Sequence, residues 1–251
     1  MHSDKLNTAA QHSATRIPGL IAVVGCDGTG KSTLTADLVK TLSSSCTVER
    51  RYLGLISGED GDKIKRLPVI GVWLERRLAA KSEKTQRMSS KAPALWAALI
   101  MYGLSVWRKA NLAKAKRLAQ SGVLVISDRY PQAEISGFYY DGPGIGVERT
   151  SGKLMTYLAE REKHLYQQMA LYQPELIIRL EIDADTAFSR KPDHNYDELR
   201  DKALVMSQLN YNGSRVLNID ARAPYDEVLQ TALAAIYPVI SAERMEKLAE
   251  A

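Results

Sequence analysis

The sequence is poor in cysteine, and its first residues carry no apolar segment. Only two cysteines occur among the 251 residues, Cys26 and Cys46, which is too few for a disulfide framework and favours a reducing compartment. A signal peptide needs a short apolar core, and the first sixteen residues contain none. We therefore expect a cytoplasmic location without export, and a disordered polar extension over residues 1–17.

The chain also lacks an apolar run long enough to cross a membrane. The stretch from Ala92 to Trp107 has sixteen residues without a charge, but a membrane-spanning helix needs about 20. We interpret it as a buried or dimer-forming helix. The stretch from Leu67 to Lys81 combines an apolar face with clustered bases, which is typical of ordinary packing with solvated charges. Contact of residues 67–107 with a membrane surface or a partner is the alternative.

Five short apolar runs indicate strands, and helical patterns lie between them. After the first run, Leu34, Leu38 and Leu42 recur every four residues, the period of one helix face. Strands that alternate with helices predict an α/β fold, with a five-stranded parallel sheet, helices on both faces, and ligands bound beyond the carboxyl ends of the strands. The runs are Leu20 to Val24, Thr47 to Leu55, Val123 to Ser127, Leu176 to Ile182 and Arg215 to Ile219.

The length favours one domain, which we place at residues 18–251. The long interval over residues 56–120 is mostly helical in pattern. We expect it to include an insertion into the domain.

The stretch VVGCDGTGKSTL, residues 23–34, lies between the first strand and the first helix. Its glycines and the Lys-Ser pair have the spacing G-x-x-x-x-G-K-S of a phosphate-binding loop. Glycines let successive backbone N–H groups curl around an anion, and the helix adds its positive N-terminal end. Lys31 would then reach the β- and γ-phosphates of ATP, and Ser32 would bind Mg²⁺. The predicted ATP-binding residues are Gly25, Cys26, Asp27, Gly28, Thr29, Gly30, Lys31, Ser32 and Thr33.

The loop occurs in proteins of many functions, so other motifs must discriminate among them. The sequence contains neither the N-K-x-D motif that reads guanine in GTPases nor the L-S-G-G-Q motif of transporter ATPases. A compact kinase, or a regulator with the same pocket, is what remains.

A second acid is expected close to this loop. Asp128 directly follows the run VLVIS, at the end of a predicted strand, where a carboxylate can hold a water on Mg²⁺ or orient the attacking oxygen. Arg129 offers a planar fork suited to a second phosphate. A helix cap with a surface ion pair is the alternative interpretation of this dipeptide.

Four segments resemble, in the same order, those of thymidylate kinases and thymidylate kinase-like proteins: GCDGTGKST, SDRY, YYDG and PELIIRLEIDADTAFSR. The resemblance extends from about Ile21 to the C-terminal helix. It implies a P-loop NTPase fold with a short lid at residues 189–200, and a homodimer formed through the long helices. It also implies that Asp27 accepts a hydrogen bond from the sugar of the acceptor nucleotide, with a local turn-stabilising role as the alternative.

Phosphoryl transfer needs cations where charge spreads over the moving group. Some members of the family carry an arginine in the loop where this chain has Gly28, so we expect the cation to come from the lid. Arg190 and Lys191 are the candidates, and closure of the lid would exclude water.

The resemblance is weakest where the family binds its base. The family's Y-Q-G glutamine contacts the pyrimidine, but here that residue is Asp141, and a carboxylate cannot offer the donor and acceptor pair of an amide. Arg108 lies where the family keeps a nucleotide-contacting arginine, with a solvated basic face as the alternative. Tyr140 can stack on a base or belong to the core. The predicted acceptor-binding residues are Asp27, Arg108, Arg129, Tyr140 and Asp141.

These motifs predict an ATP- and Mg²⁺-dependent kinase that phosphorylates a pyrimidine nucleoside monophosphate. A deoxynucleoside kinase of the same fold and a non-catalytic nucleotide-binding regulator are the alternatives. The 34 Lys and Arg residues exceed the 29 Asp and Glu residues, but many bases lie at predicted phosphate sites or are scattered along helices, so we expect no nucleic-acid partner. The predicted catalytic residues are Lys31, Asp128, Arg129, Arg190 and Lys191, and the predicted metal ligands are Ser32 and Asp128.

Overall fold

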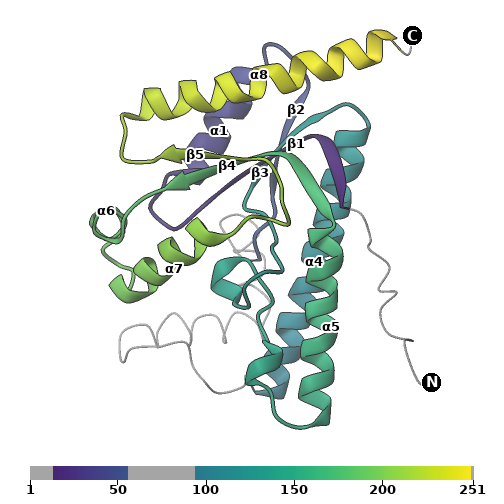
Figure 1. The fold of residues 1–251 in the computed structure, drawn as a ribbon, viewed down its shortest axis with the longest axis vertical. Coiled ribbons are helices and arrows are strands. Elements are labelled where there is room, and N and C mark those ends of the chain that lie inside the picture. Colours follow the sequence, from purple (N-terminus) through teal and green to yellow (C-terminus); the bar gives the residue numbers. More distant parts are fainter. Residues whose placement is uncertain (1–13, 56–93, 250–251) are drawn as a thin grey trace, which may run out of the picture.

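A parallel five-stranded sheet with the strand order β2-β3-β1-β4-β5 forms the centre of the molecule (Figure 1). The computed structural model describes residues 14–55 and 94–249. Its strands are β1 (Thr15–Gly25), β2 (Val48–Tyr52), β3 (Leu124–Asp128), β4 (Tyr172–Glu181) and β5 (Val216–Asp220). Its α-helices are α1 (Lys31–Leu42), α4 (Leu95–Gln120), α5 (Lys153–Ala170), α6 (Ala184–Arg190), α7 (Tyr196–Gln208) and α8 (Tyr225–Ala249), with short 3-10 helices at Phe138–Tyr140 and Val147–Arg149.

Helices cover both faces of the sheet, which confirms the predicted α/β architecture of a P-loop NTPase. Ile21 and Val23 of β1 pack with α1 and α8, while Ala22 and Val24 pack with α4 and α5. All four side chains are at most 1% exposed. Figure 1 shows α8 and α1 together at the top and α4 beside α5 as a long pair that runs downward. Burial on both faces explains why the strand reads as a continuous apolar run.

The first strand begins earlier than its apolar run indicates. Residues 15–17, which we assigned to a disordered extension, belong to β1, and Ile17 is 2% exposed. The pairing of β1 with β4 shifts between Ile17 and Ile21. Pro18 lacks a backbone donor and Gly19 has a φ of 71°. This irregularity interrupts the apolar pattern without ending the strand.

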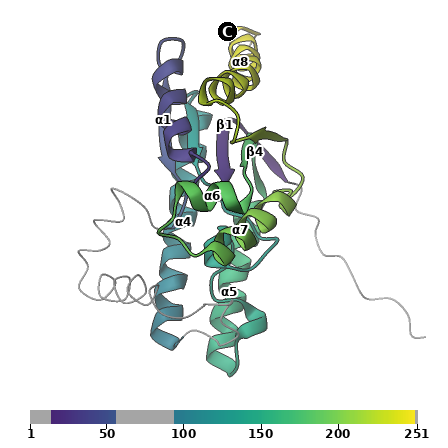
Figure 2. The same cartoon turned by 90° about the vertical axis from the view of Figure 1, so that its left-hand side faces the viewer.

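The carboxyl ends of three strands meet at one edge of the sheet. Val23 lies opposite Asp128, and Gly25 lies opposite Leu180. The phosphate loop therefore starts between the ends of β3 and β4. Helices α6 and α7 lie at the same edge, beyond the end to which the β1 arrow points (Figure 2). The predicted lid, residues 189–200, comprises the end of α6, the turn after it and the start of α7.

The uncharged stretch from Ala92 to Trp107 contributes the first half of α4, which begins at Leu95. Within residues 14–55 and 94–249, no helix combines the length and apolarity that crossing a bilayer requires. The amphipathic stretch at residues 67–81 lies outside the described residues.

One face of α4 fits the homodimer that the family resemblance implies. Leu95, Leu99 and Val106 lie on one side of the helix at spacings of four and seven residues and are 43%, 52% and 44% exposed. Apolar side chains gathered in this way are typical of an interaction surface. We expect light scattering to give twice the mass of one chain for the wild type and the mass of one chain for Leu99→Glu. A monomeric wild type would contradict this prediction.

Candidate functional site

The phosphate loop is packed tightly between β4 and α6, and two of its glycines are required for this. At Gly25, where φ is 148°, an added Cβ would lie 2.6 Å from the carbonyl oxygen of Leu180. At Gly28, where φ is 87°, it would lie 3.1 Å from the carbonyl oxygen of Ala187. Both backbone conformations are also unfavourable for residues with a side chain. Inside the loop, the Thr29 hydroxyl donates to the carbonyl oxygen of Cys26 at 2.9 Å.

Lys31 begins helix α1 and folds back over the loop. Its Nζ donates to the carbonyl oxygen of Cys26 at 2.5 Å and approaches the Thr29 hydroxyl at 3.4 Å. The residue is 6% exposed. Burial, followed by the nearby Arg129 charge, lowers the pKa of Lys31 to about 8. The ammonium is thus held over the loop by neutral oxygens, which an anion can replace.

Ser32 and Asp128 lie together, as the sequence predicts. The Ser32 hydroxyl donates to Oδ2 of Asp128 at 2.8 Å. Asp128 is 2% exposed at the end of β3. Arg50, which the sequence analysis missed, donates to the same oxygen from β2 at 3.0 Å. Its role becomes visible only once β2 is known to lie beside β3.

These oxygens fit a magnesium site that a nucleotide completes. Mg²⁺ in nucleotide-binding enzymes is commonly held by one or two protein oxygens together with phosphate oxygens and waters. The Ser32 hydroxyl and the Asp128 carboxylate form such a pair. Over the described part of the chain, no three His, Cys, Asp or Glu side chains gather as a metal site of their own. The residues present therefore suit a cation that arrives with its ligand.

A chain of alternating charges extends from the loop to helix α4. Asp27 accepts from Lys202 at 3.0 Å and from Arg129 at 3.1 Å. Arg129 also donates to Asp141 at 3.3 Å, and Arg108 donates to the other oxygen of Asp141 at 2.9 Å. Arg108, Asp141 and Lys202 are at most 5% exposed. The chain brings together four residues that the sequence predicts and one, Lys202, that it does not.

Both acids in this chain are ionised at neutral pH. Burial alone would raise the pKa of Asp27, but the charges of Lys202, Lys31 and Arg129 hold it far below its usual range. Burial likewise opposes ionisation of Asp141, and Arg129 and Arg108 together lower its pKa. Opposite charges within contact distance outweigh desolvation at both carboxylates.

Two members of the chain hold unusual backbone conformations. Arg129 and Asp141 have φ values of 71° and 63°, in the left-handed region that side chains other than glycine avoid at a cost of about 1–3 kcal/mol each. The N–H of Arg129 donates to the carbonyl oxygen of Val23 at 2.9 Å, which fixes this conformation against β1. Strained residues that are ion-paired to each other beside a phosphate loop indicate a functional site.

The lid places only one of its two predicted cations at the loop. Arg190 at the end of α6 donates to the carbonyl oxygen of Gly28 at 3.3 Å. Lys191 follows the helix and is exposed, and no hydrogen bond of the described residues joins its side chain to the loop. Of the two predicted lid cations, Arg190 is therefore the one that contacts the phosphate loop.

The aromatic ring beside the charged chain belongs to Tyr139. Lys202 Nζ lies 4.0 Å from the centroid of this ring. The predicted acceptor residue Tyr140 is 6% exposed and packs edge-on against Tyr139, with the ring centroids 5.9 Å apart. Both belong to a 3-10 turn, in which consecutive side chains point about 120° apart because three residues complete a turn.

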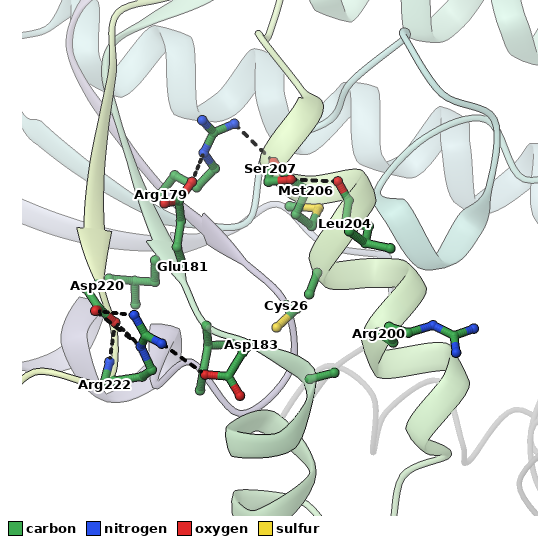
Figure 3. Close-up of a pocket in the computed structure, with 14 residues that line it drawn as sticks. Cys26, Arg179, Glu181, Asp183, Arg200, Leu204, Met206, Ser207, Asp220 and Arg222 are labelled. Carbon is green, nitrogen blue, oxygen red and sulfur yellow. Dashed lines mark hydrogen bonds and ion pairs between the residues drawn. The ribbon is translucent and has the colours of Figure 1, made fainter.

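A pocket of about 500 Å³ opens between the ends of β4 and β5 and helix α7 (Figure 3). Cys26 places the phosphate loop at its wall. Just beyond β5, Arg222 pairs with Asp220 at 2.8 Å and with Asp183 at 3.3 Å. Helix α7 reaches the pocket beside Arg179, which is 8% exposed. The sequence analysis identified none of these residues apart from Cys26.

Comparisons with known proteins identify similar bacterial chains. The protein named "Uncharacterized ATP-binding protein YghR" is 69% identical over 238 residues in Escherichia coli strain K12 and in E. coli O6:H1 strain CFT073, covering 93% of this chain and 94% of the relative. "Uncharacterized ATP-binding protein YghS" of E. coli K12 is 46% identical over 222 residues, covering 88% of this chain and 94% of the relative. No family model matches the chain.

Proposed function

Because the chain belongs to the family of the E. coli ATP-binding proteins YghR and YghS, we propose that it binds ATP and transfers the γ-phosphoryl group to a pyrimidine nucleoside monophosphate. One observation carries the proposal. Asp128, which contacts the Ser32 hydroxyl of the phosphate loop, is followed directly by Arg129, which lies in the buried chain of charges. This adjacency supports the proposal that the donor phosphates and the acceptor phosphate bind side by side.

On the donor side, Lys31 exchanges the Cys26 carbonyl oxygen for phosphate oxygens, and the loop N–H groups surround the same anion. Ser32 and Asp128 are the residues that would hold Mg²⁺. When bound, Mg²⁺ neutralises phosphate charge. Arg190, already at Gly28, covers the γ-phosphoryl group from the lid side.

On the acceptor side, Arg129 presents its guanidinium to a phosphate, and Asp27 accepts from a sugar hydroxyl. The phosphoryl group moves as the bond from the γ-phosphorus to its bridging oxygen breaks and a bond to an acceptor phosphate oxygen forms, which leaves ADP and a nucleoside diphosphate. The acceptor oxygen is already anionic, so no side chain needs to take a proton. Catalysis is alignment and charge neutralisation.

The environment of Asp128 favours a phosphate acceptor over a hydroxyl acceptor. A deoxynucleoside kinase needs a base for the attacking hydroxyl. Oδ2 of Asp128 already accepts hydrogen bonds from Ser32 and Arg50. Such engagement suits a carboxylate that supports a metal better than one that removes a proton.

A coupled assay of ADP release tests the function, with Mg²⁺, ATP and a panel of pyrimidine monophosphates and the corresponding nucleosides. We expect turnover with at least one monophosphate and none with nucleosides. The variant Lys31→Met serves as the inactive control. Tight ATP binding without turnover of any panel member would contradict the kinase proposal. The remaining interpretation would then be a nucleotide-binding regulator.

The low pKa of Lys31 makes nucleotide binding pH-dependent. In the free protein this pKa is about 8, against an ordinary value of 10.5, and a bound polyphosphate favours the charged ammonium. Above pH 8 binding must therefore take up a proton, and the affinity should fall by up to about tenfold per pH unit. Since the unfolded chain keeps this proton up to a higher pH, the free protein should gain stability between pH 8 and 10.5.

Calorimetry in buffers of different ionisation enthalpy measures this proton uptake. We expect uptake of a proton at about pH 9 and much less at about pH 7, the internal control. Equal uptake at both values would contradict the assignment to Lys31.

A further inference from the structure

Lys202 is a buried cation for which the proposed phosphoryl transfer has no role so far. The residue lies on α7 and is 1% exposed. Its Nζ contacts Oδ2 of Asp27 at 3.0 Å and lies 4.0 Å from the centroid of the Tyr139 ring. Taking an ammonium out of water costs several kcal/mol unless partners offset it. Its contact with Asp27 suggests that the charge of Lys202 acts on the carboxylate of the phosphate loop.

The position of Lys202 is fixed by anchors at the end of α7. Arg179 Nη1 donates to the carbonyl oxygens of Met206 and Leu209, at 3.0 and 2.7 Å. Just beyond the helix, the Glu134 carboxylate accepts from the backbone N–H groups of residues 210 and 212, at 2.9 and 3.0 Å. Two charged side chains from β4 and from the loop after β3 thus hold this end of α7. Lys202 lies about one helical turn before Met206. The contacts that hold the end of α7 therefore also restrict the position of Lys202.

Asp27 creates an electrostatic conflict in a loop that binds polyphosphate. Its carboxylate stands between Cys26 and Gly28 and is ionised, so it repels a phosphate placed in the same loop. Each of its oxygens is held by one cation, Oδ1 by Arg129 and Oδ2 by Lys202. Arg129 also forms an ion pair with Asp141. Among the described residues, Asp27 is the only carboxylate with which Lys202 forms an ion pair.

We propose that Lys202 is a positioning residue of the nucleotide site, which neutralises and orients Asp27 so that the phosphate loop accepts a polyphosphate. The inference rests on the ATP binding of the proposed function and does not depend on the acceptor. Lys202 acts through Asp27 and touches no phosphate. Its removal should therefore matter only while Asp27 is charged.

Calorimetric binding of AMP-PNP with Mg²⁺ to the full chain tests this coupling. We expect Lys202→Met to weaken binding about tenfold, and Lys202→Arg to stay within about threefold of wild type because the charge remains. Asp27→Asn, and Asp27→Asn combined with Lys202→Met, should bind alike within about threefold, since the neutral amide needs no counter-ion. Lys109→Met is the matched control: this lysine of α4 contacts Gln168 and should leave affinity unchanged.

The double variant keeps the test decisive if Lys202→Met alone fails to fold, because it leaves no unpaired buried carboxylate. Equal affinity of wild type and Lys202→Met overturns the proposal. So does a further tenfold loss on adding Lys202→Met to Asp27→Asn, which would mark a structural or phosphate-contacting lysine. A wild type that does not bind AMP-PNP overturns both this inference and ATP binding. Binding without turnover overturns only the kinase.

Discussion

Replacement of Lys31 by methionine is expected to reduce turnover by at least about 100-fold. A loss of this size is typical when one donor that stabilises developing charge is removed. We expect the protein to remain at least as stable as the wild type. Lys31 is 6% exposed, and its ammonium contacts a carbonyl and a hydroxyl oxygen. No carboxylate of the described residues forms an ion pair with it. Its pKa is lowered to about 8 because burial disfavours the charge. Methionine fills similar space without that charge. Function should be lost and stability retained or raised.

Lys40→Met is the matched control, because Lys40 lies exposed in the last turn of the same helix. Its turnover should stay within about twofold of wild type, as is usual for surface substitutions away from a site. Thermal unfolding of both variants, followed beside the coupled assay, separates loss of function from loss of fold. A Lys31→Met protein that melts well below wild type, or that turns over normally, contradicts the role assigned to this lysine.

Local sequence predicts the elements of this fold better than their arrangement. All five predicted runs lie in or overlap the observed strands. The central strands β1, β3 and β4 are largely buried and contain continuous apolar stretches, whereas the edge strands β2 and β5 are only partly buried. The order β2-β3-β1-β4-β5 depends on long-range pairing, which no local pattern encodes. The predicted start of β1 was wrong because Pro18 and Gly19 interrupt the apolar pattern. Residues 15–17, which precede this interruption, nevertheless pair with β4.

The site shows the same division. Lys31, Ser32 and Asp128 were predictable because loop geometry and a strand end place them together. Lys202 and Arg50 were not, because Lys202 contacts an acid 175 positions away and Arg50 one 78 positions away. Only the fold brings such pairs together. A lysine in the middle of a polar helix gives no local sign that it is buried.

The largest effect on stability is expected at Arg108, the residue that anchors the chain of charges in α4. Arg108 is fully buried, and both of its terminal nitrogens donate to Asp141, one to the backbone carbonyl at 3.1 Å and one to the carboxylate at 2.9 Å. Among the described residues, Arg108→Met leaves Arg129 as the remaining ion-pair partner of this carboxylate. We expect the free energy of unfolding to fall by about 3–5 kcal/mol, as for other buried pairs that lose one partner. Urea unfolding followed by circular dichroism measures it.

A double-mutant cycle and the pH dependence separate this ion pair from simple packing. Arg108→Met combined with Asp141→Asn should cost less than the sum of the single changes, because no unpaired charge remains. The pKa of Asp141 is lowered in the fold, so its contribution exists above the ordinary aspartate pKa of 3.8 and is lost as the pH falls through the folded value. Without Arg108 this loss should begin at higher pH.

The matched control is Arg117→Met, because Arg117 is an exposed arginine of the same helix. This variant should change the free energy of unfolding by less than about 0.5 kcal/mol. Additive costs together with an unchanged acid limb would show that Arg108 stabilises α4 by packing and not by its charge.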